Sequence, residues 1–449
     1  MPAKPTFLAR LSLILLAVIA GGLAGLPFLA TPARAFTIYT VTRFDDPIPD
    51  NCLPSDCSLR EAVRAANITP GTDLIVLPAG VYTLSLLRTK IDPDAANGDL
   101  DITDDLIIQG ADAANTIIDG NGSVTFDRIF EITTGVTVRI SGVSIYRGYP
   151  LELIGGGGIL NAGSLTLTLS RVISNTVGND GGGIANLGTL VISRSLIMSN
   201  TGVSSTSGFG GGLYNEGQLT IFESTISGNK NRIGGGLDNS QQATATLINS
   251  TVSGNRASEN GGVINNRGTS LLHLANVTLT ANRVEMVANN AAWNGAGLKS
   301  GLNSTVNIRN TLIADNQKIG VLFDPINDDC KGILTSAGYN VVRATAGCII
   351  NGDTSGNLIG QPAQLGPLAD NGGPTPTHML NANSPAVNAG NPAGCTDPAG
   401  NNLTTDQRGY SRPVNGGSGQ SRCDIGALEF GGVDSAPPER RIYLPIVLK

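Results

Sequence analysis

Residues 181–201 read GGGIANLGTLVISRSLIMSNT, and close copies of this stretch return several times along the chain. Each copy starts with a glycine cluster, followed by an aliphatic residue and, two positions later, by an Asn or a Ser. A second Asn follows at a nearly constant distance, whereas the gap to the next glycine cluster varies. Such self-similarity at a period of roughly 20–50 residues indicates a repeat architecture. The first column comprises Asn161, Asn186, Asn215, Asn239, Asn266 and Ser300, and the second comprises Asn175, Asn200, Asn229, Asn255, Asn282 and Asn316.

Aliphatic residues occupy fixed positions within every copy. Two of these positions lie two residues apart, as in the pair Leu165 and Leu167 and the pair Leu190 and Ile192. This is the period of a β-strand with one apolar face. One copy cannot bury that face alone, but stacked copies can. Stacking places like residues above like at about 4.8 Å, so aliphatic side chains fill the interior and aligned Asn side chains can form hydrogen-bonded ladders.

The composition also favours a β-rich solenoid. The chain has 59 Gly, with only 14% charged and 4% aromatic residues, which fits short strands and many turns. Leucine-rich repeats would show a helix in each unit, and propeller blades need about 40 residues each. We therefore predict an all-β fold: a single right-handed parallel β-helix, a solenoid similar to that of pectate lyases, with a short N-terminal capping helix and an irregular C-terminal cap. The repeats are assigned to residues 105–345.

The first 35 residues have the pattern of an export signal. Lys4 and Arg10 precede an apolar run, and a small-x-small cleavage motif ends at Ala35. A retained membrane anchor is the alternative, but glycines and Pro27 interrupt the run. Removal of residues 1–35, which carry Lys4, Arg10 and Arg34 and no acid, takes the net charge from −6 to −9. An acidic chain is a poor partner for nucleic acid, because phosphate binding requires a basic surface.

Residues 36–104 are predicted to form the N-terminal cap, which closes an otherwise exposed apolar end. Within it, residues 57–67 read CSLREAVRAAN, in which Ser58 and Glu61 have the spacing of a helix capping box. The following apolar residues define one helical face. We interpret Arg60, Glu61 and Arg64 as surface charges on this helix rather than as catalytic groups.

The C-terminal part of the chain differs from the repeats in composition. Residues 346–430 are rich in Pro, Gly and Asn, which predicts an irregular, turn-rich cap. Residues 431–449 form a linker and the apolar tail IYLPIVLK. This tail is too short to cross a bilayer as a helix. It is expected to be a sorting or docking tag, or another edge strand.

The six cysteines fall into neighbouring pairs. An even count, close spacing and an exported chain predict three local disulfides. Free buried thiols are the alternative, and sequence alone does not decide the pairing. The pairs are Cys52 with Cys57, Cys330 with Cys348, and Cys395 with Cys423.

Two motifs and the repeats resemble known families. CSLREAVRAAN resembles the N-terminal CSLREA-type domain of exported bacterial β-helix proteins. GPLADNGGPTPTHML, DQRG and CDIGALEF together resemble the choice-of-anchor Q region that often closes such proteins. The repeats are similar to those of polymorphic outer-membrane proteins, although an aliphatic residue replaces the family's Phe and no autotransporter barrel follows. The resemblance implies an exported or surface β-helix protein and no established catalytic residues.

No catalytic constellation is evident in the sequence. Many parallel β-helices act on acidic polysaccharides, and such activity needs carboxylates, or carboxylates with a cationic base, on one outer face. The outward columns of the repeats show no stacked acids. We predict a cross-strand ion pair between Arg194 and Glu223. His273 is expected on a polar strand face, and neither it nor His378 belongs to a recognisable triad.

One acidic stretch and three aromatic residues remain as candidate sites. Asp92, Asp94 and Asp99 resemble the front of a calcium loop, but the closing Glu of an EF-hand is absent and a solvated turn is the alternative. Ca²⁺ is the one cofactor that the sequence suggests. Sugar-stacking surfaces could be provided by Phe209, Tyr214 and Trp293.

These observations favour a secreted or cell-surface β-helix scaffold for adhesion or glycan binding, without catalysis. The expected partner is an extracellular or envelope polysaccharide or a surface protein, and membrane contact is expected only through the signal peptide or the C-terminal tail. The first alternative is a secreted polysaccharide lyase or glycoside hydrolase. The second is a structural envelope-layer protein held through its tail.

Overall fold

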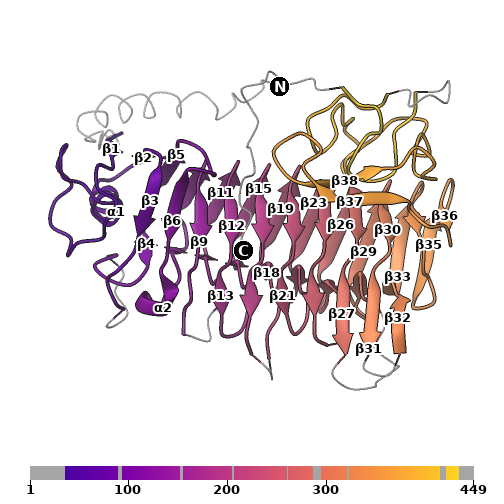
Figure 1. The fold of residues 1–449 in the computed structure, drawn as a ribbon, viewed down its shortest axis with the longest axis horizontal. Helices are drawn as coiled ribbons and strands as arrows, with labels where there is room; N and C mark the ends of the chain where they lie inside the picture. Colours follow the sequence, from indigo (N-terminus) through magenta and orange to yellow (C-terminus); the bar gives the residue numbers. More distant parts are fainter. Residues whose placement is uncertain are drawn as a thin grey trace, which may run out of the picture. The chain divides into compact units, whose positions relative to one another are not determined.

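The computed structural model describes residues 36–88, 94–151, 155–204, 207–259, 261–286, 295–320, 323–414 and 421–433. These residues form a parallel β-helix, in which strands of successive coils pair in parallel and in register (Figure 1). The predicted fold class is therefore confirmed. None of the helices in the described part of the chain is long and apolar enough to span a membrane. The predicted signal peptide lies outside the described residues, as does residue range 434–449 of the tail.

Each complete coil contributes strands to three faces of the solenoid, which we call the first, second and third faces. The first face contains β1 (Ile38–Thr40), β2 (Asp73–Leu77), β5 (Leu106–Gly110), β8 (Thr137–Ser141), β11 (Ser164–Thr168), β15 (Thr189–Ser193), β19 (Gln218–Phe222), the first halves of β23 (Thr244–Ser253) and β26 (Leu271–Thr280), β29 (Thr305–Arg309), β33 (Cys330–Ala337) and β35 (Cys348–Asp353).

The second and third faces consist of shorter strands. The second face contains β3 (Gly80–Thr83), β6 (Thr116–Asp119), β9 (Ser144–Tyr146), β12 (Arg171–Ile173), β16 (Leu196–Met198), β20 (Thr225–Ser227), the second halves of β23 and β26, β30 (Leu312–Ala314), β34 (Val341–Val342) and β36 (Leu358–Ile359). The third face contains β4 (Leu100–Ile102), β7 (Phe130–Ile132), β10 (Ile159–Asn161), β14 (Ile184–Asn186), β18 (Leu213–Asn215), β22 (Leu237–Asn239), β25 (Ile264–Asn266) and β28 (Leu298–Ser300).

A small separate sheet and two short helices complete the coils. The helices are α1 (Leu59–Ile68) and α2 (Gly122–Thr125). The separate sheet contains β13 (Thr176–Val177), β17 (Thr201–Gly202), β21 (Lys230–Asn231), β24 (Arg256–Ala257), β27 (Arg283–Met286), β31 (Gln317–Gly320) and the antiparallel β32 (Phe323–Asn327).

The interior is a continuous apolar column, as the repeat predicts. Leu167 pairs in register with Ile192, and Ile192 pairs with Ile221 on the next coil. All three are 0% exposed and belong to one apolar cluster that runs through the solenoid. Burial of such side chains supplies about 1.5–3 kcal/mol each.

The two Asn columns form hydrogen-bonded ladders at the corners of the coils, which confirms that prediction. In the first ladder each Nδ2 donates to the Oδ1 of the next coil at 2.7–2.8 Å, from Asn161 to Asn266. The second ladder runs from Asn175 to Asn316 and ends on Oδ1 of Asp329 at 2.8 Å. These buried amides bond to one another and to backbone groups, which satisfies most of their polar atoms. The exception is Oδ1 of Asn161 at the start of the first ladder, which is buried and has no hydrogen-bond partner among the described residues.

Replacement of one rung tests the ladder. The side chain of Asn229 accepts from the backbone and side chain of Asn200 and donates to Ile197 and Asn255. Asn229→Ala leaves buried partners without hydrogen bonds, so we expect the free energy of unfolding in urea to fall by about 2–4 kcal/mol. The control Asn303→Ala, at an exposed turn residue, should change it by less than about 0.5 kcal/mol. Equal losses in both variants would contradict a structural role for the ladder.

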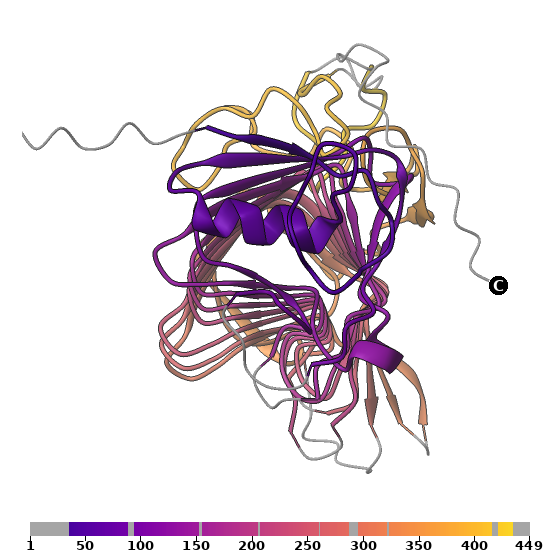
Figure 2. The same cartoon turned by 90° about the vertical axis from the view of Figure 1, so that its left-hand side faces the viewer.

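The helix α1 closes the N-terminal end of the coils, across which it lies in Figure 2. Ser58 caps it, and Ser58 and Glu61 form the predicted capping box. The helix buries four apolar side chains against the interior column, namely Leu59, Ala62, Val63 and Ala66.

The prediction that the charges of α1 lie on the surface is wrong for Arg60 and Glu61. The side chain of Arg60 is 0% exposed and pairs with Asp46 at 2.7 Å. Its guanidinium also donates to the carbonyls of Ala95, Gly98 and Asp99. A charge can be buried when it is paired and hydrogen-bonded in this way. The partners are distant in the sequence, so the helical pattern alone could not reveal them.

The boundary expected at residue 345 and the cap expected over the C-terminal end need correction. The coils continue through β34, β35 and β36 to Ile359. Residues 363–414 and 421–433, which we call the flank segment, then fold back along the side of the second face (Figure 1). The flank segment includes the antiparallel strands β37 (Leu365–Ala369) and β38 (Thr377–Leu380).

Outward apolar residues on the last coils explain why the flank segment folds back. Leu312, Ala314 and Val341 point away from the interior column and form a second apolar cluster with Ile425 and Leu428 of the flank segment. Several hydrogen bonds join the same surfaces. Examples are Thr225 Oγ1 to the carbonyl of Pro376 at 2.7 Å and Asn310 Nδ2 to the carbonyl of Asp424 at 2.8 Å.

Residues of the motifs DQRG and CDIGALEF, together with Arg412, form the buried ionic centre of the flank segment. In DQRG, Arg408 pairs with Asp406 at 2.7 Å, and Arg412 pairs with Glu429 of CDIGALEF at 3.0 Å, with both side chains 0% exposed. Burial, and then the neighbouring Glu429, raise the pKa of Asp424 to about 7. These motif residues therefore fold the segment onto the coils.

The raised pKa of Asp424 predicts a pH-dependent attachment. Below about pH 7 Asp424 keeps its proton in the folded segment, whereas in the detached segment it ionises near its ordinary, lower pKa. The stabilising contribution is therefore complete below about pH 4 and is lost as the pH rises through about 7. We expect limited proteolysis to release the flank segment faster at pH 8 than at pH 5.

Two variants check the origin of this effect. Asp424→Asn should flatten the pH dependence, whereas Asp370→Asn, at an exposed flank residue, should keep it. Cleavage of an unstructured peptide at each pH corrects for the protease. Faster release of the segment at pH 5 would refute the assignment.

All six cysteines pair as predicted, in the disulfides Cys52–Cys57, Cys330–Cys348 and Cys395–Cys423. The first lies next to α1, the second joins β33 to β35 and the third lies within the flank segment. Disulfides are typical of oxidising compartments outside the cytosol.

Candidate functional site

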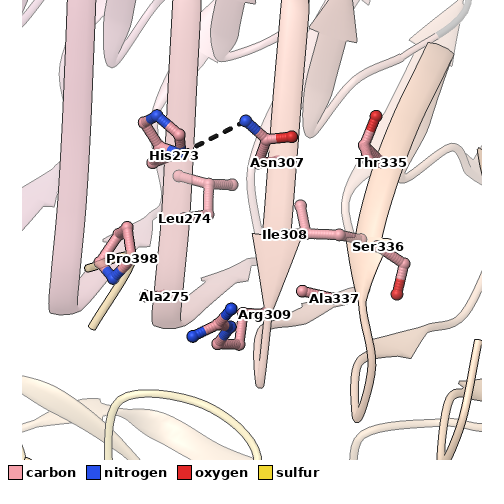
Figure 3. Close-up of a pocket in the computed structure, with 10 residues that line it drawn as sticks. All are labelled: His273, Leu274, Ala275, Asn307, Ile308, Arg309, Thr335, Ser336, Ala337 and Pro398. Atoms are coloured by element: carbon pink, nitrogen blue, oxygen red, sulfur yellow. Dashed lines mark hydrogen bonds between the residues drawn. The ribbon is translucent and has the colours of Figure 1, made fainter. Parts of the chain in front are cut away.

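A pocket of about 220 Å³ lies on the outer side of the first face, next to the flank segment (Figure 3). Its floor comes from three successive strands, β26, β29 and β33, and its edge from the flank segment. The lining residues are His273, Leu274, Ala275, Asn307, Ile308, Arg309, Thr335, Ser336, Ala337 and Pro398.

Strand register brings the polar residues of this pocket together. His273 pairs with Asn307, and Asn307 pairs with Thr335, so these three form one outward column. Arg309 is two residues after Asn307 and therefore points to the same side. Leu274 and Ile308, which lie between them, point into the apolar interior. The alternation of the strands thus makes the outer face polar and the inner face dry.

The electrostatics of the pocket combine one cation with neutral hydrogen-bonding groups. Burial lowers the pKa of His273, so its ring is neutral at pH 7. Its Nδ1 lies 3.3 Å from Nδ2 of Asn307. Because an amide nitrogen can only donate, Nδ1 is the acceptor and the ring proton is assigned to Nε2. The imidazole therefore offers a donor at Nε2.

The flank segment orients Arg309. Its Nη1 donates to Thr396 Oγ1 at 2.8 Å and to the carbonyl of Asp397 at 3.1 Å. The ion pairs found among the described residues do not include Arg309. Its charge is held by neutral groups and stays available to an anion. This arrangement could not be predicted from local sequence patterns, since Thr396 lies 87 residues further along the chain.

Together these groups suit a hydroxylated, negatively charged ligand. Amide, hydroxyl and imidazole groups bond to hydroxyls, and a guanidinium binds a carboxylate or sulfate. None of the ten lining residues carries a carboxyl group. The pocket thus lacks the pair of acids on which most glycoside hydrolases depend.

The predicted sugar-stacking residues lie elsewhere, on the third face. The guanidinium carbon of Arg267 lies 4.1 Å from the centre of the Phe209 ring. Arg267 also pairs at 3.0 Å with the buried Asp238, whose register partner on the preceding coil is Tyr214. The structure thus gathers Phe209 and Tyr214 around one ion pair, which occupies one face of Phe209. Trp293 lies outside the described residues.

Burial shifts the pKa values of the ionisable groups in this third-face cluster. Burial raises the pKa of Asp238 to about 6, against the opposing effect of Arg267. Burial also raises the pKa of Tyr214 to about 12, and its hydroxyl donates to Glu216. Arg267 pairs with Asp238 and Tyr214 donates to Glu216, so these groups bond to one another. The cluster is best explained as a link between neighbouring coils.

An acidic cluster lies near the N-terminal end, but it differs from the predicted one. Carboxylate oxygens of Asp99, Asp101 and Glu131 lie within 4.8 Å of one another. Of the predicted calcium ligands, only Asp99 takes part. Asp94 is exposed and lies 3.4 Å from Arg64, and Asp92 lies outside the described residues.

The surroundings of this cluster do not favour a metal ion. Burial, followed by the charges of Asp127 and Asp101, raises the pKa of Asp99 well above its usual range. Arg128 contacts the carboxylates of both Asp99 and Glu131. A divalent cation would be held by the three carboxylates and would have to compete with this guanidinium.

Two further predictions can be placed in the structure. Arg194 and Glu223 form the expected cross-strand ion pair at 2.7 Å. His378 lies with Nε2 2.7 Å from Ser253 Oγ and with Nδ1 2.7 Å from the carbonyl of Gly366. This Ser–His pair was not predicted, because its members lie 125 residues apart and no motif links them. Ser253 is 2% and His378 7% exposed, so the pair is closed to a substrate and fastens the flank segment to β23.

No family model matches this chain, and no curated protein is significantly similar to it. The resemblance to CSLREA-type and choice-of-anchor Q proteins therefore stays a prediction from motifs.

Proposed function

We propose that this chain is an exported β-helix scaffold that binds an acidic polysaccharide on its first face. The pocket lined by His273, Asn307 and Arg309 is the centre of the binding surface. The observation that carries the proposal is Arg309, a cation without an ion-pair partner among the described residues, beside a column of neutral hydrogen-bonding groups.

The regular spacing of the first face supports a polymeric ligand. The column that contains His273 continues through Thr246 and Thr220 on the preceding coils. Its side chains repeat at the coil spacing of about 4.8 Å. A polysaccharide that runs along the solenoid therefore meets hydrogen-bonding groups at regular intervals, and the flank segment forms a wall beside it.

Export is supported by independent features. The first 35 residues have the signal-peptide pattern, and three disulfides fit an oxidising environment. The apolar tail at 442–449 is proposed to retain the protein at the cell surface. In that location the scaffold serves adhesion to an envelope or environmental glycan.

One observation favours a lyase as the second candidate. A lyase removes a proton next to a uronate carboxylate, which requires a base and a cation that stabilises the developing charge. The guanidinium of Arg309 and the neutral ring of His273 line the same pocket. The unprotonated nitrogen of this ring is Nδ1, so it is Nδ1 that would act as the base, once Asn307 releases it. Formation of unsaturated products from alginate or pectate, measured by their absorbance, would support this second function.

Binding measurements test the proposal. Affinity electrophoresis in gels that contain alginate, pectate or a neutral glucan should show retardation by the acidic polymers. Arg309→Ala should weaken binding about tenfold or more, because Arg309 is the one cation among the ten described lining residues. Asn307→Ala should weaken binding less.

A matched variant controls for the general effect of losing a positive charge. Arg283→Ala removes an exposed cation from β27 of the separate sheet, outside the first face, and should leave binding unchanged. Equal binding by wild type and Arg309→Ala, or tighter binding to the neutral glucan, would contradict the proposal.

A further inference from the structure

The C-terminal end of the coils differs from every other level of the stack. Among the described residues, β35 pairs only with β33, and β36 pairs only with β34. Figure 1 shows no described element beyond these two strands. The outer edge of β35 therefore presents backbone N–H and C=O groups that no strand of the described chain satisfies, which is the usual template for pairing with another chain.

The interior column is also open at this end. Val342 is 0% exposed, whereas its register partner on the last coil, Ile359, is 47% exposed. Leu334 is 0% exposed, and its partner Ile350 is only partly buried. A hollow of about 340 Å³ results, lined by Thr345, Cys348, Ile350, Thr354, Asn357 and Ile359.

At the opposite, N-terminal end, the apolar column is closed by a helix of the same chain. There, α1 covers the first coil and buries apolar side chains against it. The flank segment contains enough chain to provide a similar lid, yet its apolar residues pack on the second face instead. Among the described residues, the end of the column at β35 is therefore left without a lid.

We propose that two copies of this chain associate through their open ends, with β35 of one copy antiparallel to β35 of the other. A two-fold axis that passes through Ile350 places this residue opposite its own copy and Ile349 opposite Asn351. In this register the interior columns of both copies join, and the edge groups of both strands find partners.

The charges of the open end fit self-association. Residues 345–359 contain a single charged residue, Asp353, in a chain with 14% charged residues overall. The two-fold register places Asp353 opposite Gly347 of the second copy, away from its own counterpart. Exposed edge strands usually carry charges or Pro that prevent pairing. β35 carries neither between Cys348 and Gly352, and its Ile349 is 61% exposed.

The assembly is limited to two copies, because α1 covers the N-terminal end of each chain and only the C-terminal end is open. The surface that meets its partner is the same on both chains, so the contact is isologous and cannot continue into a filament. The dimer would also align the two first faces in one continuous strip. This inference does not depend on the proposed polysaccharide binding.

Sedimentation equilibrium of the purified chain over a range of concentrations tests the proposal. The wild type should sediment with twice the monomer mass. Ile349→Lys and Asn351→Lys, both at exposed positions of β35, should raise the dissociation constant of the dimer at least about tenfold, because each brings an unpaired charge into the contact. Circular dichroism checks that both variants fold.

Ile48→Lys is the matched control, since Ile48 is 82% exposed near the opposite end, and it should leave the dimer intact. Amide exchange in β35 should slow as the dimer forms. A monomer at all concentrations, open-ended oligomers, or a dimer broken by Ile48→Lys instead of Ile349→Lys would overturn the proposal. A monomer that dimerises only after residues 434–449 are removed would also overturn it, because the tail would then be the occupant.

Discussion

The structure depends on the register between successive coils. Aliphatic residues can form a dry column only if each coil repeats the corners of the previous one, and the corners are set by buried Asn side chains. An aliphatic column alone tolerates small shifts along the strands, because apolar contacts have no direction. The amide ladders remove that freedom, since Asn229 must meet both Asn200 and Asn255 at hydrogen-bond distance. Specific pairing therefore comes from the polar corners, and most of the stabilising energy comes from the apolar column.

The same register produces the candidate site. His273, Asn307 and Thr335 lie on three separate coils, yet they form one column because the strands that carry them are aligned. The flank segment adds the wall and orients Arg309 through Thr396. The buried pairs Arg408–Asp406 and Arg412–Glu429 hold that wall in place. Motif residues far from the pocket thus determine its shape.

The fold could be predicted from the sequence because the fixed spacing of Asn and aliphatic residues within each repeat allows the copies to be aligned with one another. Leu167, Ile192 and Ile221 could be placed in one column from spacing alone. Local pairing of the cysteines was expected from their even number, their short separations and the export signal, although the sequence did not decide the pairing. Features that depend on contacts between distant, non-repeating segments could not be predicted. The partner of Arg60 is Asp46 in an irregular loop, and His378 meets Ser253 only because the flank segment folds back. Composition could indicate turns in the flank segment but not the surface on which it lies.

The second Asn ladder has a direction, because every amide donates toward the C-terminal end and accepts from the N-terminal side. A chain of this kind needs a final group that only accepts, and the carboxylate of Asp329 supplies it. Coils can be added or lost in the middle without disturbing this rule, since each new Asn continues the row. The number of coils is thus free to change during evolution, while the two terminal structures that begin and stop the row must be kept.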